Sequence, residues 1–213
     1  MADSDGMGLT SLPLPLHLIL LHGWGASGDD LLPVGQELTR ALGLSDGAVT
    51  LRALEAPDVH PAGGGARQWY DLNTPGWPGI PEAVADLGLR LDQELAAAGD
   101  EPVVVLGFSQ GAAMALEAAM PRPCAAVIAC SGYPHPGWSL DGSVAVPLLV
   151  LHGQDDQVVP VAAAEAIATM VRSAGGRVDC QVLSGGHTIS QEALQHMARF
   201  LKDLGLQPVQ ANA

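Results

Sequence analysis

The segment GFSQG at residues 107–111 has the G-x-S-x-G pattern that presents a serine as a nucleophile. An apolar, β-rich run at 102–106 precedes it, and an alanine-rich run with helical character follows at 112–118. A strand, a sharp turn and a helix in this order strain the serine backbone and expose its Oγ above a sheet. Glycines flank the serine because side chains there would collide with the neighbouring strand and helix. The pattern predicts that Ser109 is a catalytic nucleophile, with a plain strand-to-helix turn as the alternative.

A serine hydroxyl needs a base, usually histidine, and the base needs an orienting carboxylate. Two later segments offer these groups just after predicted strands. The run at 147–151 leads to Asp155 and Asp156, and the run at 178–183 leads to a glycine-rich loop that holds His187. The carboxyl ends of parallel strands share one edge of a sheet, so Ser109, one aspartate and His187 are expected to meet there. The residues alone leave the choice of aspartate open. The alternative is that the aspartates cap a turn and that His187 is an ordinary loop histidine.

Two further histidines lie close to these segments. His22 begins the turn after the first predicted strand, where its ring could hydrogen-bond the backbone. His152 ends a later strand and could shape the turn that carries the aspartate. Neither has the position before a helix that His187 has, so both are interpreted as structural.

The first predicted strand ends in the glycine-rich turn LHGWGASGDD at 21–30. Glycines there let the backbone approach a reaction centre closely. An oxyanion could be met by the N–H that follows the nucleophile, at Gln110, and by a second from this turn, for which Trp24 is the natural donor. Because both donors are backbone groups, side-chain substitutions at Gln110 or Trp24 are expected to cost less activity than loss of a donor. The alternative is a simple glycine-rich turn, but no Walker lysine or G-x-G-x-x-G pattern indicates a nucleotide site.

Residues 56–80 are rich in glycine and proline yet carry Trp69, Tyr70 and Trp77. Long loops with aromatic residues are more often functional than idle. Together with Trp24, these side chains are predicted to line an apolar pocket for the acyl or alcohol part of a substrate. Packing within the loop is the alternative for each of them.

The elements that must position these groups alternate along the chain. Most of the apolar runs are continuous, as in strands covered on both faces, whereas the run at 178–183 alternates like an edge strand. Strand–helix alternation implies a mostly parallel sheet with helices on both faces. Strands are predicted at 17–21, 48–54, 103–106, 125–129, 148–151 and 178–183, and helices near 30–42, 81–98, 110–119, 161–174 and 191–204.

Composition limits the class of protein. The chain has 213 residues, of which 48% are hydrophobic and 15% charged, which predicts one globular domain over 1–213 with its core at about 15–205. The formal net charge of -14 argues against nucleic acid and against anionic membranes as partners. Free buried thiols at Cys124, Cys130 and Cys180, no secretory signal and no membrane span favour a cytoplasmic protein. No metal or cofactor site is indicated.

The ordered set of motifs resembles the phospholipase/carboxylesterase family, which comprises small serine esterases of the α/β-hydrolase fold, including acyl-protein thioesterases. The resemblance spans about residues 18–204. It implies a sheet of six or seven strands without a large cap domain. It also implies Ser109, Asp156 and His187 as the catalytic triad, with oxyanion N–H groups from Trp24 and Gln110. The motifs that carry it are LHGWG at 21–25, QWYD at 68–71, GFSQG at 107–111, HGQDDQVVP at 152–160 and GH at 186–187.

The expected activity is hydrolysis of short- to medium-chain acyl esters through an acyl-enzyme, without a cofactor. Thioesterase action on acylated proteins or other acyl thioesters is the first alternative, since it would use the same groups. A peptidase or acyltransferase, or a non-catalytic binding protein that keeps the fold, are further alternatives. The expected partner is a small acyl ester or thioester, and the oligomeric state is left open.

Overall fold

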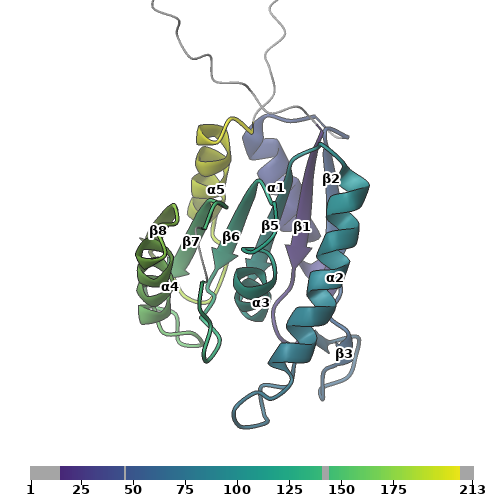
Figure 1. Ribbon diagram of the computed structural model, residues 1–213, viewed down its shortest axis with the longest axis vertical. Helices are drawn as coiled ribbons and strands as arrows, with labels where there is room; N and C mark the ends of the chain where they lie inside the picture. The colour runs from purple at the N-terminus through teal and green to yellow at the C-terminus, as the bar shows by residue number, and fades with distance from the viewer. Residues whose placement is uncertain (1–14, 46, 141–143, 207–213) are drawn as a thin grey trace, which may run out of the picture.

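The computed structural model describes residues 15–45, 47–140 and 144–206 of the chain. Its centre is a six-stranded sheet in the order β2-β1-β5-β6-β7-β8, and every neighbouring pair is parallel (Figure 1). The predicted mostly parallel sheet is confirmed, and β8 is an edge strand as its alternating pattern indicated. The strands are β1 (Leu16–Leu21), β2 (Val49–Leu54), β5 (Val103–Phe108), β6 (Ala126–Cys130), β7 (Leu148–Gly153) and β8 (Val178–Leu183).

The helices lie within two residues of the predicted ranges. They are α1 (Leu32–Leu42), preceded by the short 3-10 helix η1 (Gly28–Leu31), and α2 (Ile80–Ala98), α3 (Gln110–Ala118), α4 (Ala162–Ser173) and α5 (Gln191–Asp203). Gly43 ends α1 at a φ of 78°, a conformation that favours glycine. The Ser190 hydroxyl accepts a hydrogen bond from the Ala193 N–H and so caps α5. These local signals explain why the helix ends could be predicted.

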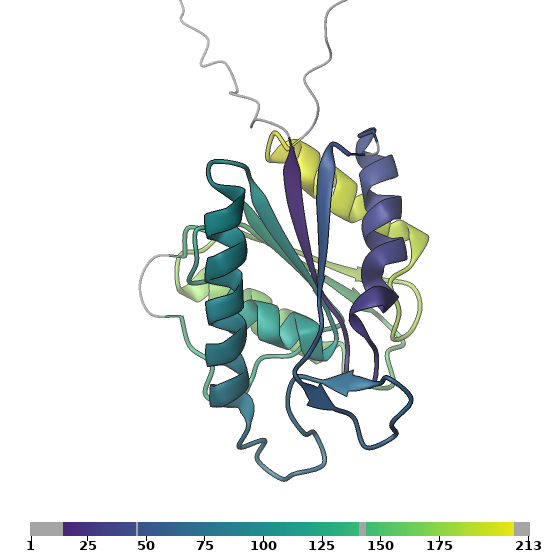
Figure 2. The same ribbon diagram turned by 90° about the vertical axis from the view of Figure 1, so that its right-hand side faces the viewer.

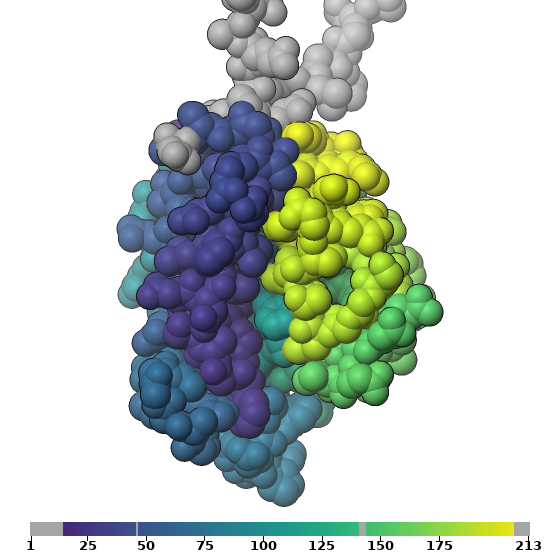
Figure 3. Space-filling view, turned by 180° about the vertical axis from the view of Figure 1, so that it is seen from behind, coloured from purple at the N-terminus to yellow at the C-terminus, as the bar shows by residue number. Residues whose placement is uncertain are grey.

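Helices cover both faces of the sheet (Figure 2). Ile19 and Leu21 of β1 belong to one core with residues of α2, α3 and α4, whereas Leu18 and Leu20 belong to a second core with residues of α1 and α5. Burial of both faces accounts for the continuously apolar central strands. Figure 3 shows α1 and α5 side by side on the rear face, where the Lys202 ammonium also donates to the Ala41 carbonyl. Within the described residues, no helix combines the length and apolar character needed to cross a membrane.

The long aromatic loop is more ordered than the sequence indicated. It contains a short antiparallel pair, β3 (Asp58–Val59) and β4 (Arg67–Gln68), which was not predicted. This pair lies near the carboxyl ends of β1 and β2 (Figure 2). Arg67 exchanges backbone hydrogen bonds with the first turn, accepting from the Gly25 N–H at 2.9 Å and donating to the Ala26 carbonyl at 2.8 Å. The loop therefore braces the glycine-rich turn that follows β1.

All three cysteines are free thiols. Cys124 and Cys130 are buried as predicted, whereas Cys180 is only half-buried. Burial raises the pKa of the Cys124 thiol to about 11 and raises that of Cys130 further. Both thiols are therefore protonated and unreactive at neutral pH.

Candidate active site

The turn after β5 has the strained geometry that its sequence predicted. Ser109 adopts a φ of 54° and a ψ of -117°, a backbone conformation that residues other than glycine rarely adopt. A Cβ on Gly107 would lie 2.3 Å from the Gly111 carbonyl oxygen, and one on Gly111 would lie 2.1 Å from the Leu21 carbonyl oxygen. Only glycine fits at either position, so the helix α3 can start directly against the sheet. The Ser109 N–H donates to the Cys130 carbonyl at 2.9 Å, which ties the turn to β6.

Asp156 and His187 are hydrogen-bonded to each other. His187 Nδ1–H donates to Asp156 Oδ2 at 2.7 Å, while Asp156 Oδ1 accepts from the N–H groups of Val158 and Val159 at 2.8 and 2.9 Å. Burial alone would raise the pKa of Asp156, but the hydrogen bonds from His187, Val159 and Val158 outweigh it and lower that pKa. The carboxylate therefore stays ionised and leaves His187 Nε2 free to accept a proton. Asp155 is exposed, so the structure distinguishes between the two aspartates that the sequence left open.

The loops that carry these two side chains pack backbone to backbone. A Cβ on Gly153 would lie 2.2 Å from the Gly186 carbonyl oxygen. The Gln154 N–H donates to the Leu183 carbonyl at 2.7 Å, and the Asp155 N–H donates to the Gly185 carbonyl at 2.8 Å. Gly153 at the end of β7 has to be a glycine because the loop after β8 approaches it this closely.

His187 lies beside the serine turn. Its ring centroid is 4.8 Å from that of Phe108, the residue before Ser109, and its side chain is 17% exposed. Ser109, Asp156 and His187 thus follow β5, β7 and β8 at one edge of the sheet. Among the described residues, Ser109 Oγ makes no hydrogen bond to His187 in this structure. Such hydrogen bonds in free enzymes are often long and tighten only when substrate binds.

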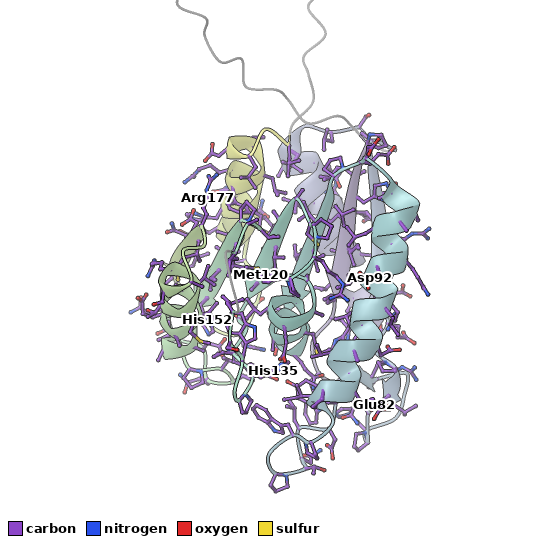
Figure 4. All side chains as sticks on the ribbon, viewed as in Figure 1. Glu82, Asp92, Met120, His135, His152 and Arg177 are labelled. Atoms are coloured by element: carbon purple, nitrogen blue, oxygen red, sulfur yellow. The ribbon has the colours of Figure 1, made fainter. Side chains whose placement is uncertain are left out.

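His152 lies at the carboxyl end of β7 (Figure 4). Its side chain is fully buried, its Nε2–H donates to the Val159 carbonyl at 2.9 Å, and Nε2 lies 3.5 Å from Asp156 Oδ2. The ring therefore holds the turn that carries Asp156, as the sequence suggested.

The turn after β1 presents its backbone toward Ser109. A Cβ on Gly23 would lie 3.4 Å from the Ser109 Cβ. His22 Nε2 accepts from the Ala56 N–H at 3.0 Å, so the proton is on Nδ1, which donates to the Gly23 carbonyl at 2.8 Å. The Gly23 carbonyl and the Trp24 N–H belong to one planar trans peptide and point to opposite sides of it. The buried His22 ring, whose pKa is lowered by that burial, thus fixes the direction of the Trp24 N–H.

Two N–H groups flank the serine without a partner. Neither the Trp24 N–H nor the Gln110 N–H donates a hydrogen bond to any residue in the described part of the chain. Gln110 is the first residue of α3, so its N–H has no acceptor within the helix and lies at the positive end of the helix dipole. These two groups have the character that an oxyanion hole requires.

The aromatic residues of the long loop occupy different environments. Trp69 and Tyr70 are each only 1% exposed, and Trp77 is half-buried with its ring near those of Tyr70 and Tyr133. A cavity of about 340 Å³ lies against Trp69 and Tyr70, but Ser109 and His187 are not among the residues that line it. Trp24 is 37% exposed, so among the predicted aromatic residues it is the most open to a ligand.

One polar cluster was not predicted from the sequence. The Tyr70 hydroxyl bonds to the Tyr133 hydroxyl at 2.7 Å and to His135 Nε2 at 2.9 Å, and His135 Nδ1 bonds to Glu117. His135 lies near α3 in Figure 4. Burial lowers the pKa of His135 although Glu117 acts in the opposite direction. The cluster joins α3 to two loops, and the pairing of residues so far apart in the chain left no local signal in the sequence.

No group of three or more histidine, cysteine, aspartate or glutamate side chains in the described residues is arranged to hold a metal ion. The sheet order, the strained serine turn and the aspartate–histidine pair at its edge define an α/β hydrolase. The family described as Phospholipase/Carboxylesterase matches residues 13–204, and the chain therefore belongs to this family.

Known relatives agree with this assignment. The chain is 30% identical to Esterase YpfH of Escherichia coli (strain K12) over 199 residues, covering 87% of this chain and 81% of the relative. It is 27% identical to Acyl-protein thioesterase 1 of Eremothecium gossypii, covering 89% of this chain and 88% of the relative. The crystal structure of esterase PE8 matches with a TM-score of 0.78 and 29% identity, covering 92% of this chain and 95% of that one. The chain is thus a serine hydrolase of the carboxylesterase/thioesterase type.

Proposed function

We propose that this enzyme hydrolyses short- to medium-chain acyl esters, with Ser109 as nucleophile, His187 as base and Asp156 as the group that orients the base. The observation that carries the proposal is the Asp156–His187 hydrogen bond of 2.7 Å next to a serine held in a strained turn. The N–H groups of Trp24 and Gln110, which donate to no acceptor among the residues that the structure describes, support it, because they could stabilise the oxyanion that forms in acyl transfer.

The reaction proceeds in two halves. His187 Nε2 takes the Ser109 proton while Oγ attacks the ester carbonyl, and the carbonyl oxygen becomes an oxyanion that accepts from the Trp24 and Gln110 N–H groups. Asp156 stays ionised and stabilises the imidazolium. His187 then gives its proton to the leaving alcohol, which leaves the acyl group on Ser109. A water molecule, deprotonated by His187, attacks the acyl-enzyme, and collapse of the second oxyanion releases the acid and restores the serine.

The substrate pocket is proposed to be formed by Trp24 and Trp77, whose rings are at least partly exposed. Trp69 and Tyr70 are buried, so they are proposed to pack beneath the pocket rather than to contact the substrate. Trp24 follows Gly23, the glycine that lies against Ser109, and its bulk is proposed to favour short acyl chains over long ones.

The substitution Ser109→Ala tests the proposal. Turnover of p-nitrophenyl acetate and butyrate is expected to fall by roughly 10⁴-fold or more, because the serine and histidine act as a unit. Ser173→Ala, at an exposed position in α4, is the matched control and is expected to retain full activity. Retention of more than a tenth of the activity by a folded Ser109→Ala variant would show that the nucleophile is another residue.

A second candidate function is thioesterase action, which the 27% identity to an acyl-protein thioesterase supports. The nucleophile and the oxyanion donors would be the same. Matched oxygen esters and thioesters, each with acyl chains from acetyl to palmitoyl, separate the two functions by their kcat/KM values. A consistently higher kcat/KM for the thioesters would favour the second candidate.

A further inference from the structure

Trp69 contacts both halves of the candidate oxyanion hole. Its indole N–H donates to the His22 carbonyl at 2.9 Å, in the turn that leads to Trp24. Its backbone N–H donates to Gln110 Oε1 at 3.0 Å, in the serine turn. Because Trp69 is only 1% exposed, neither hydrogen bond competes with bulk water.

The Gln110 side chain completes the link. It is fully buried, and its Nε2 donates to the Tyr70 carbonyl at 2.8 Å while Oε1 accepts from Trp69. The residue that offers one candidate oxyanion N–H through its backbone is therefore anchored to the aromatic loop by its own side chain. The sequence had suggested that substitution of this side chain costs less activity than loss of a donor, and that Trp69 touches substrate.

We propose that the Trp69 and Gln110 side chains form a clip that sets the spacing of the two oxyanion donors, the N–H groups of Trp24 and Gln110. The proposal of a Trp69–Gln110 clip rests on the proposed function. In it, Trp69 and Gln110 act as positioning residues. The consecutive carbonyls before the Trp24 N–H are both held, that of His22 by Trp69 and that of Gly23 by the His22 ring. Donors held in this way need no reorganisation when charge develops on the substrate oxygen.

The substitution Trp69→Phe tests the clip with little change of shape. It keeps an aromatic ring and the backbone hydrogen bond to Gln110 but removes the indole donor to His22. The expected result is a kcat about 10- to 100-fold lower with KM within about twofold, since the loss of a whole donor costs about 10²–10³ in kcat. Trp138→Phe is the matched control, because Trp138 is also buried and takes part in none of the clip's hydrogen bonds, and its kcat is expected to stay at the wild-type value.

Affinity for a trifluoromethyl ketone provides a readout that a merely structural role would not change. Ser109 Oγ adds to the ketone carbon, the serine proton moves to His187, and the ketone oxygen becomes an oxyanion in the hole. The inhibition constant for Trp69→Phe is expected to rise by the same factor by which kcat/KM falls. Wild-type values of kcat/KM and inhibition in a folded Trp69→Phe variant, well below its melting temperature, would overturn the clip.

Gln110→Met offers a second variant, since it keeps the length of the side chain but leaves the Trp69 N–H and the Tyr70 carbonyl unpaired. Its effect on kcat is expected to combine less than additively with that of Trp69→Phe, because the two residues act as one unit. Full additivity of two folded variants contradicts a shared clip.

If the wild-type protein itself neither hydrolyses esters nor binds the ketone, the proposed function fails, whereas an active wild type with unaffected variants refutes the clip alone.

Discussion

The proposed base side and the proposed oxyanion side of the site are held in different ways. On the base side, Asp156 is fixed by the N–H groups of its own turn, and the loops after β7 and β8 adhere through backbone contacts. On the oxyanion side, buried side chains from three distant segments lock the backbone, namely those of His22, Trp69 and Gln110. His187 is 17% exposed, and Asp156 provides the one hydrogen bond that its ring makes to the described residues.

This difference matches what each side has to do. An oxyanion hole works best when its dipoles are fixed before charge develops, because reorganisation would otherwise cost free energy in the transition state. A base has to exchange protons with the serine, the leaving group and water in turn. A histidine ring that is hydrogen-bonded at Nδ1 and free at Nε2 can shift slightly between these proton-transfer partners. The buried oxyanion donors, in contrast, are held in place.

Loss of the Asp156 carboxylate, which is proposed to orient the base, has the largest expected effect. Asp156→Asn is expected to lower kcat by about 10⁴-fold with the fold retained, because an amide donor favours the wrong tautomer of His187. Asp155→Asn, at the exposed neighbouring position, is expected to leave kcat within about twofold. The kcat of both variants on p-nitrophenyl esters tests this prediction. Equal kcat values would show that Asp156 is not part of the triad.

Changes at His152 sharpen the comparison, because this residue is a buried side-chain anchor on the otherwise backbone-held base side. His152→Leu leaves the Val159 carbonyl unpaired, at a cost of about 1–3 kcal/mol in the free energy of unfolding. Loss of the ring is also expected to displace Asp156. A displacement that costs about 1.4 kcal/mol in the transition state lowers kcat tenfold. His152→Gln can keep a donor near Nε2 and is expected to recover part of both losses. Identical urea midpoints and kcat values for His152→Leu, His152→Gln and the wild type would show that His152 contributes neither to stability nor to activity.

The smallest expected effect concerns acid pH. The folded-state pKa of His22 is lowered below 6.5 by burial, so the unfolded chain binds more protons as the pH falls through that value. The free energy of unfolding is therefore expected to decrease as the pH falls from about 7.5 to about 5.5, the range in which the protonation of His22 differs between the folded and unfolded states. His22→Asn can still donate to the Gly23 carbonyl but does not titrate, so urea denaturation should show a shallower pH dependence for it. A steeper or equal slope in the variant contradicts this assignment.

Asp156 acts in the same pH direction as His22 but at lower pH. Its pKa is lowered in the folded state, so its contribution to stability is present above the unfolded value of 3.8 and is lost as the pH falls below it. The oxyanion side is thus expected to weaken on mild acidification, and the base side only in stronger acid.

The sequence predicted the base side better than the oxyanion side, for a physical reason. Asp156 and His187 follow apolar strands, and parallel strands deliver their carboxyl ends to one edge, so order along the chain is enough to place them. The helices were predictable from periodicity and from capping residues such as Gly43 and Ser190. These signals are local.

The clip and the β3–β4 pair depend on hydrogen bonds between residues that no local pattern connects. Nothing near Trp69 in the sequence indicates that its indole reaches the His22 carbonyl, and G-x-S-x-G patterns specify only the backbone of the residue after the serine. The burial of Trp69 and Tyr70 likewise results from tertiary packing, which aromatic composition alone cannot distinguish from a pocket lining.

The nucleophile is the central claim, and covalent labelling tests it most directly. The wild-type protein is treated with a fluorophosphonate probe, digested, and sequenced by mass spectrometry. One adduct is expected, on Ser109 in the peptide that contains residues 107–111. In Asp156→Asn the adduct is expected to be absent or to form at a greatly reduced rate. An adduct on another serine, or no adduct on a protein that hydrolyses p-nitrophenyl butyrate, would show that Ser109 is not the nucleophile.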